Sequence, residues 1–144
     1  MRFLKHATRI AVAGVAMFAA SLTTGATATA ASTPEGTCGA GYYEIDHHDL
    51  PNGTIHLMYN GSTDCVVTWK TQNVGTKTYM MAGVGSTLPP NGTIPNGKSA
   101  TWDVDAGQFA YYAGPVYWYA PGACIAWFGV ARQDSWTSQM SHCG

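Results

Sequence analysis

The sequence predicts an all-β fold, a compact antiparallel sandwich or barrel-like domain of about eight or nine short strands closed by two disulfides. Three observations favour this class. The 17 Gly and 7 Pro interrupt the 144 residues densely, and no stretch of about ten residues carries a helical apolar stripe. The segments between these breaks are rich in Val, Ile, Thr, Tyr and Trp, which favour strands. The 4 cysteines form an even set, as expected for two disulfides made in an oxidising compartment.

The first 30 residues have the three-part pattern of a secretory signal peptide. Basic residues at 2, 5 and 9 precede an apolar run at 10–22, and small residues with an A-x-A site ending at Ala30 follow. The run is too short to span about 30 Å of hydrocarbon, which argues against a membrane anchor. We expect cleavage near Ala30, a flexible segment at 31–37 and one exported all-β domain at 38–144, with no membrane partner after cleavage.

The chain beyond residue 30 is acidic, with 4 basic and 8 acidic side chains and a net charge of −4. A nucleic-acid partner is not expected, because such a protein carries a clustered excess of Lys and Arg. The aromatic fraction of 12% and the charged fraction of 10% also argue against a disordered chain.

The expected strands follow in chain order from these patterns, at 41–46, 54–59, 64–71, 77–84, 99–104, 108–113, 116–119, 124–131 and 136–142. Alternation places Ile55, Leu57 and Tyr59 on one face of the second strand. In the third strand, residues 65, 67 and 69 oppose residues 66, 68 and 70. The strand at 124–131 is apolar on both faces, so we expect it to be central or covered on both sides.

Two further segments are assigned to turns and loops. Segment 88–98 contains three Pro and two Asn-Gly pairs, so we expect a mobile loop there rather than a strand. Asp103 and Asp105 are expected to flank a hairpin turn at 104–107, because Asp side chains bond to the backbone in turns.

The densest polar cluster precedes the turn at 51–53 and consists of Glu44, Asp46, His47, His48 and Asp49. Alternation would place Glu44, Asp46 and His48 on one face, where they could bind a divalent cation or act as acid and base. We favour a solvated strand end, because polar residues gather beside turns. The cysteines are too widely spaced for a thiolate metal site, and we expect no cofactor.

Aromatic residues crowd into one stretch, at Tyr111, Tyr112, Tyr117, Trp118 and Tyr119. Most are expected to build the core, because a domain with few Phe residues must fill its interior with other rings. One or two exposed rings could instead stack on sugars. Tyr117 and Trp118, which alternate in direction, are the candidate ligand contacts.

No catalytic residue is expected. The sequence contains no G-x-S-x-G nucleophile elbow, and so small an all-β chain has little room for the facing carboxylates of a glycosidase. The chain is therefore expected not to be an enzyme.

The disulfide pairing is predicted from a hairpin between the last two strands. A turn centred on 133–134 places Cys124 opposite Cys143, at a separation that a disulfide can bridge. The same register opposes two further couples, Trp127 with Met140 and Ile125 with His142. Cys38–Cys65 then follows by elimination. The rival pairing, which joins the first cysteine to the fourth and the second to the third, stays open.

Several motifs resemble a known family. They are the block QFAYYAGPVYWYAPGACIAW at 108–127, the segment from Asn60 to the run Cys-Val-Val-Thr at 65–68, and the layout of the cysteines up to the final Cys-Gly pair. Over 38–144 the chain resembles the spore-associated protein A family, small exported proteins of spore-forming filamentous actinobacteria. The resemblance implies secretion and a place on the spore or cell surface, and it implies no catalytic residue or cofactor.

We therefore expect a secreted, non-catalytic protein whose partner is the spore or cell-wall surface, with a glycan as a candidate ligand. Two alternatives stay open. The protein could be a carbohydrate-binding module that uses exposed Trp or Tyr rings, or a secreted enzyme inhibitor that presents the loop at 88–98.

Overall fold

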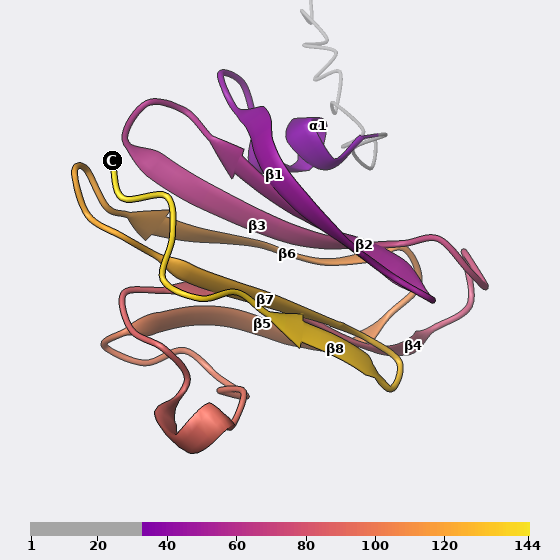
Figure 1. Cartoon of the computed structure of the whole chain (residues 1–144). Helices are drawn as coiled ribbons and strands as arrows, with labels where there is room; N and C mark the ends of the chain where they lie inside the picture. Colours follow the sequence, from indigo (N-terminus) through magenta and orange to yellow (C-terminus); the bar gives the residue numbers. More distant parts are fainter. Residues whose placement is uncertain (1–32) are drawn as a thin grey trace, which may run out of the picture.

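The computed structural model describes residues 33–144 and contains two four-stranded antiparallel sheets packed face to face (Figure 1). This arrangement confirms the all-β sandwich. The strand order is β1-β2-β3-β6 in the first sheet and β5-β4-β7-β8 in the second. The signal peptide predicted at 1–30 lies outside the described residues. Within residues 33–144, no helix has the length and apolar character needed to cross a bilayer.

The elements follow one another in the order α1 (Pro34–Cys38), β1 (Tyr43–Leu50), β2 (Gly53–Tyr59), β3 (Thr63–Lys70), β4 (Thr78–Gly85), the short 3-10 helix η1 (Pro90–Gly92), β5 (Trp102–Phe109), β6 (Tyr112–Tyr119), β7 (Ala126–Ala131) and β8 (Asp134–Thr137).

The core between the sheets lies where alternation predicts it. Ile55 and Leu57 of β2, Val66 of β3 and Trp127 of β7 are all buried there. Every residue of β7 is buried, and β7 is an inner strand of its sheet. The expectation that this strand is central and covered on both faces is therefore confirmed.

Helix α1 covers the outer face of the first sheet (Figure 1). A disulfide joins Cys38 at its end to Cys65 of β3, and these residues pack with Met58 and Val67. The side chain of Thr33 accepts a hydrogen bond from a backbone N–H of the first turn, which caps the helix. The cap and a Pro in the first turn begin this helix within the segment 31–37, whose first two residues lie outside the described part of the chain.

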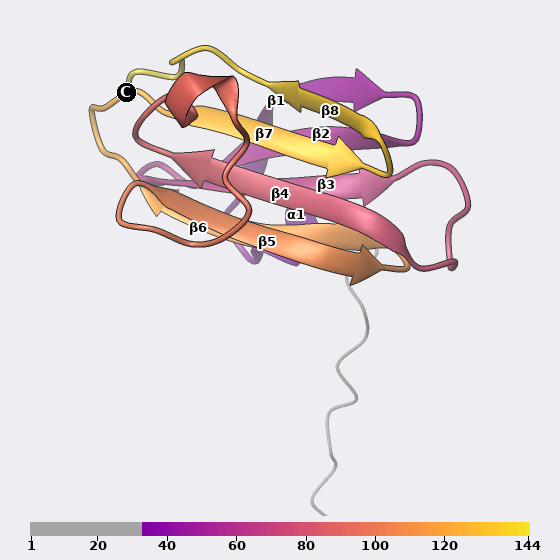
Figure 2. The same cartoon turned by 90° about the horizontal axis from the view of Figure 1, so that it is seen from below.

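The loop between β4 and β5 covers the outer face of the second sheet (Figure 2). Its Ile94 packs against a cluster that includes Trp102 and Phe128, whose ring centroids are 5.3 Å apart. Segment 88–98 is thus a loop, as its Pro and Asn-Gly content predicts, and it holds no strand. Its cover explains why both faces of β7 are apolar.

The turn predicted at 104–107 is wrong, because these residues lie inside one continuous strand, β5, and the chain turns only after Phe109. Asp103 and Asp105 lie within β5 and bond to the neighbouring edge strand of the other sheet. The Asp105 carboxylate accepts from the Gly114 N–H at 2.8 Å, and the Asp103 carboxylate accepts from the Tyr117 N–H at 2.9 Å. The Asp residues therefore serve backbone groups of β6 rather than a local turn.

Lys70, the last residue of β3, is buried. Its Nζ donates to the backbone carbonyls of Thr76 at 2.5 Å and Phe109 at 3.0 Å. Burial lowers the pKa of this ammonium. These two hydrogen bonds join the end of β3 to the segment before β4 and to the last residue of β5.

The hairpin of β7 and β8 forms as predicted, but its turn and register are different. The turn lies one residue earlier and includes Arg132, which has a left-handed backbone with φ of 63°. The Trp127 N–H donates to Ser138 Oγ at 2.9 Å instead of lying opposite Met140. The sequence does not indicate a turn at Arg132, because left-handed positions in tight turns favour Gly or Asn rather than Arg.

Beyond β8 the tail continues alongside β7 and reaches the end of the second sheet where β7 begins. Ile125 bridges Ser141 rather than His142, and a disulfide joins Cys124 to Cys143. The structure thus has the pairing chosen from the sequence, with a different register beside it. The disulfide fixes the last residues of the tail at one end of the sandwich.

Candidate functional site

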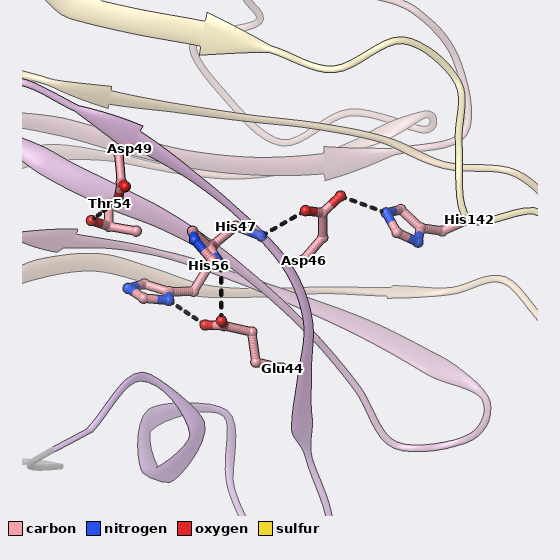
Figure 3. A network of polar contacts seen from close by, with 7 residues as sticks. All are labelled: Glu44, Asp46, His47, Asp49, Thr54, His56 and His142. Atoms are coloured by element: carbon pink, nitrogen blue, oxygen red, sulfur yellow. Dashed lines mark hydrogen bonds and ion pairs between the residues drawn. The ribbon is translucent and has the colours of Figure 1, made fainter.

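The polar cluster predicted before the turn at 51–53 lies along β1, an edge strand of the first sheet (Figure 3). The register with β2 shifts between Glu44 and Asp46, so Ile45 is an extra residue in a β-bulge. The bulge reverses the alternation after this point. The expectation that Glu44, Asp46 and His48 share one face is therefore wrong, and the cluster divides between the two faces.

On the outer face, Glu44 contacts two imidazoles (Figure 3). Its carboxylate lies 3.1 Å from His47 Nδ1 and 2.5 Å from His56 Nδ1. Further along the edge, Asp49 accepts a hydrogen bond from the Thr54 hydroxyl at 2.8 Å. The polar side chains on this face therefore pair with one another, within β1 and between β1 and β2.

On the inner face, the cluster contacts the C-terminal tail and β8. Asp46 Oδ2 lies 3.1 Å from His142 Nε2, and the His48 ring stacks on Trp136 with centroids 4.1 Å apart and an interplanar angle of 9°. Within residues 33–144, no three His, Cys, Asp or Glu side chains come together in an arrangement that could hold a metal ion.

A cavity of about 340 Å³ opens beside this contact, at the end of the sandwich where the tail is fixed. It is lined by Ile45, Tyr59, Asp64, Ala120, His142, Cys143 and Gly144. The volume falls within the range of small-molecule sites. The bulge supplies one wall and the tail another, so the cavity depends on both features.

Asp64 is the most perturbed group of this cavity. The residue is only 3% exposed, and within residues 33–144 its carboxylate has no hydrogen-bond or ion-pair partner. Desolvation raises its pKa to about 6, and the nearby His142 opposes that rise. The register of β3 and β6 places Asp64 opposite Trp118, so a lone carboxylate lies beside a core ring.

The two candidate ligand contacts of the aromatic stretch point in opposite directions. Trp118 packs against the core between the sheets, and Tyr117 is 39% exposed on the outer face. The Tyr117 hydroxyl donates to the Cys38 carbonyl at 3.0 Å, and its ring lies 5.9 Å from that of Tyr42. Burial raises the pKa of the Tyr117 phenol. Tyr117 thus helps to hold α1 in place.

Two other tyrosines near the cavity are more exposed to solvent than Tyr117. Tyr119 is 70% exposed and directly precedes Ala120, which lines the cavity. Tyr43 is 55% exposed, and its ring packs edge-on against Tyr59, with centroids 6.4 Å apart.

Sequence reasoning missed Asp64, Tyr59 and His142 as site residues. One signal was present, since alternation in β3 places Asp64 on the same inward face as Val66. A carboxylate on that face is an exception to the apolar pattern, and such exceptions mark candidate sites. Nothing in the sequence predicts that His142 lies nearby, because its position depends on the path of the tail.

Comparison with known proteins adds one strong similarity. The chain is 36% identical over 122 residues to spore-associated protein A of Streptomyces coelicolor, an alignment that covers 83% of this chain and 72% of that protein. No family model matches the sequence, and no solved structure matches it. The identity and its coverage agree with the resemblance of the motifs around the cysteines and the aromatic stretch, and they show that the chain belongs to the spore-associated protein A family.

Proposed function

We propose that this protein is exported and associates with the surface of spores or of the cell wall, without catalytic activity of its own. The observation that carries this proposal is its similarity to spore-associated protein A. The signal-peptide pattern of the first 30 residues supports export. The two disulfides support it as well, because disulfides persist outside the reducing cytosol.

The covalent restraint of the fold also supports a location outside the cell. Each disulfide closes a loop in a domain of modest size, with sequence separations of 27 and 19 residues. Loops of this length contribute about 3 kcal/mol each to the free energy of unfolding. A protein exposed on a surface without chaperones benefits from such covalent restraint.

The test is fractionation of a sporulating culture with an antibody to this protein. We expect the protein in the spore or wall fraction, and we expect purified folded protein to sediment with washed spores. The reduced and carboxymethylated chain is the control, since it has the same composition without the fold. If the protein stays in the culture fluid and does not sediment with spores or isolated wall, the proposal is wrong.

A second candidate, glycan recognition, is favoured by the exposed tyrosines beside the cavity. Exposed rings stack on the CH faces of sugars, and Tyr119 is the most exposed large apolar residue of the described chain. Sedimentation with peptidoglycan, chitin or cellulose should fall in Tyr119→Ala. Tyr79→Ala, a 41% exposed tyrosine of the second sheet, is the matched control. Equal sedimentation of both variants with wild type would exclude Tyr119 from glycan binding.

A further inference from the structure

The cavity at the end of the sandwich holds a buried charge that the described protein leaves without a partner. Asp64 is 3% exposed, its carboxylate borders the cavity of about 340 Å³, and no cation of residues 33–144 pairs with it. A buried ionised carboxylate is costly unless it is paired or hydrogen-bonded. A ligand that supplies the missing partner would therefore gain binding free energy in this cavity.

The neighbouring groups do not supply that partner. The imidazole of His142 lines the cavity, but its Nε2 lies 3.1 Å from Asp46 and is paired with that carboxylate instead. Tyr59 lines the cavity as well, and within residues 33–144 its hydroxyl makes no hydrogen bond to Asp64. The side chains of Ile45 and Ala120 give the wall an apolar part.

We propose that this cavity binds a small ligand through a primary ammonium group that pairs with the Asp64 carboxylate. An ammonium donates up to three hydrogen bonds and cancels the buried charge. The apolar wall suits the carbon skeleton that carries the ammonium, and the Tyr59 ring suits a cation at close range.

Other ligand classes fit less well. An anion would be repelled by Asp64 and by the net charge of −4 of the chain beyond residue 30. A metal ion would need several ligands, and within residues 33–144 no three His, Cys, Asp or Glu side chains are arranged to hold one. A neutral polyol could donate hydrogen bonds to the carboxylate but would leave its charge uncompensated.

An alkylammonium and an amino sugar share the proposed chemistry, and two pairs of probes distinguish them. The first pair is n-butylammonium and 1-butanol, and the second is D-glucosamine and N-acetyl-D-glucosamine. In each pair the second compound lacks the ammonium. We expect one or both ammonium probes to shift the amide resonances of the cavity residues at pH 7.5 in two-dimensional NMR, while their neutral partners leave them unchanged. The larger response identifies the carbon skeleton.

The variant Asp64→Asn should weaken ammonium binding at least about tenfold, because it removes the charge and keeps the size. Asp49→Asn is the matched control, since it makes the same change in charge at an exposed position of β1. The wild-type protein gives an independent readout. A bound ammonium favours the ionised carboxylate, so it should lower the midpoint of the Asp64 carboxyl ¹³C titration.

Two results would overturn the proposal. One is equal binding of ammonium probes and their neutral partners, or binding that Asp64→Asn does not weaken. The other is an Asp64 titration that is unchanged by saturating concentrations of both ammonium probes. Because these measurements involve no spores or wall, they are independent of the proposed surface association.

Discussion

We expect the burial of Asp64 to lower the free energy of unfolding at neutral pH, and the size of this effect can be worked out from the shift in its pKa. Desolvation raises its pKa from 3.8 to about 6. A difference of about 2 units corresponds to about 3 kcal/mol, at about 1.4 kcal/mol per unit. Since the carboxylate borders a cavity open to water, screening reduces this value. We therefore expect Asp64→Asn to raise the free energy of unfolding by about 1–3 kcal/mol at pH 7.5.

The sign of the pH dependence is fixed by the direction of the shift. A carboxyl whose pKa is higher in the folded state binds its proton more tightly there. Its contribution to stability is therefore fully present below pH 3.8, the unfolded value, and is lost as the pH rises through about 6. His142, which opposes the shift, and Tyr42, which lies in the field of Asp64, are its titratable neighbours.

Urea unfolding followed by tryptophan fluorescence, at intervals from pH 3.5 to 8, measures this effect. The advantage of Asp64→Asn over wild type should be small at pH 3.5 and should grow up to about pH 7. Asp49→Asn controls for the change in net charge. Parallel stability curves for wild type and Asp64→Asn across this range would refute the argument that Asp64 is desolvated in the folded state.

Three further changes test the packing and the covalent restraint by the same unfolding assay. Gly129→Ala should cost about 1–3 kcal/mol, because its Cβ would overlap side chains of the core between the sheets; Gly97→Ala, with open space around it, should be near neutral, and equal stabilities would contradict this packing. Lys70→Met should cost about 2 kcal/mol, because it leaves two backbone carbonyls without their donor; an unchanged midpoint would show that water replaces it. Replacing both Cys124 and Cys143 by Ala should cost about 3 kcal/mol for a separation of 19 residues, and a loss under 1 kcal/mol would mean that the tail is held by other contacts.

The parts of the fold that could be predicted are those where a local property of the sequence, such as alternation or the missing N–H of Pro, decides the structure without a tertiary contact. Alternation along β2, β3 and β7 gives the correct faces, because each strand lies within a sheet and one of its faces meets the other sheet. The loop at 88–98 follows from Pro, which removes the N–H that a central strand needs.

The errors arose where a tertiary contact replaced a local one. Asp103 and Asp105 have the composition of a turn, but their carboxylates accept from N–H groups of β6. The bulge at Ile45 has no local signal, and it changes the direction of every side chain that follows in β1. The sequence could therefore identify the polar residues of β1 but not the partners that each of them meets.

The cavity could be predicted from the sequence only in part, because it depends both on a local pattern and on tertiary contacts. Its carboxylate is visible in the sequence as a break in the inward face of β3, at Asp64. Its walls depend on Ile45, the extra residue of the bulge, and on Cys143, which its disulfide holds over the end of the sandwich. Asp64 is expected to lower the free energy of unfolding at a position where an apolar side chain would pack well. Such a residue is most simply explained by ligand binding, because binding to the folded state restores the stability that the buried carboxylate removes. An ammonium ligand should therefore stabilise the wild-type protein and leave the stability of Asp64→Asn unchanged.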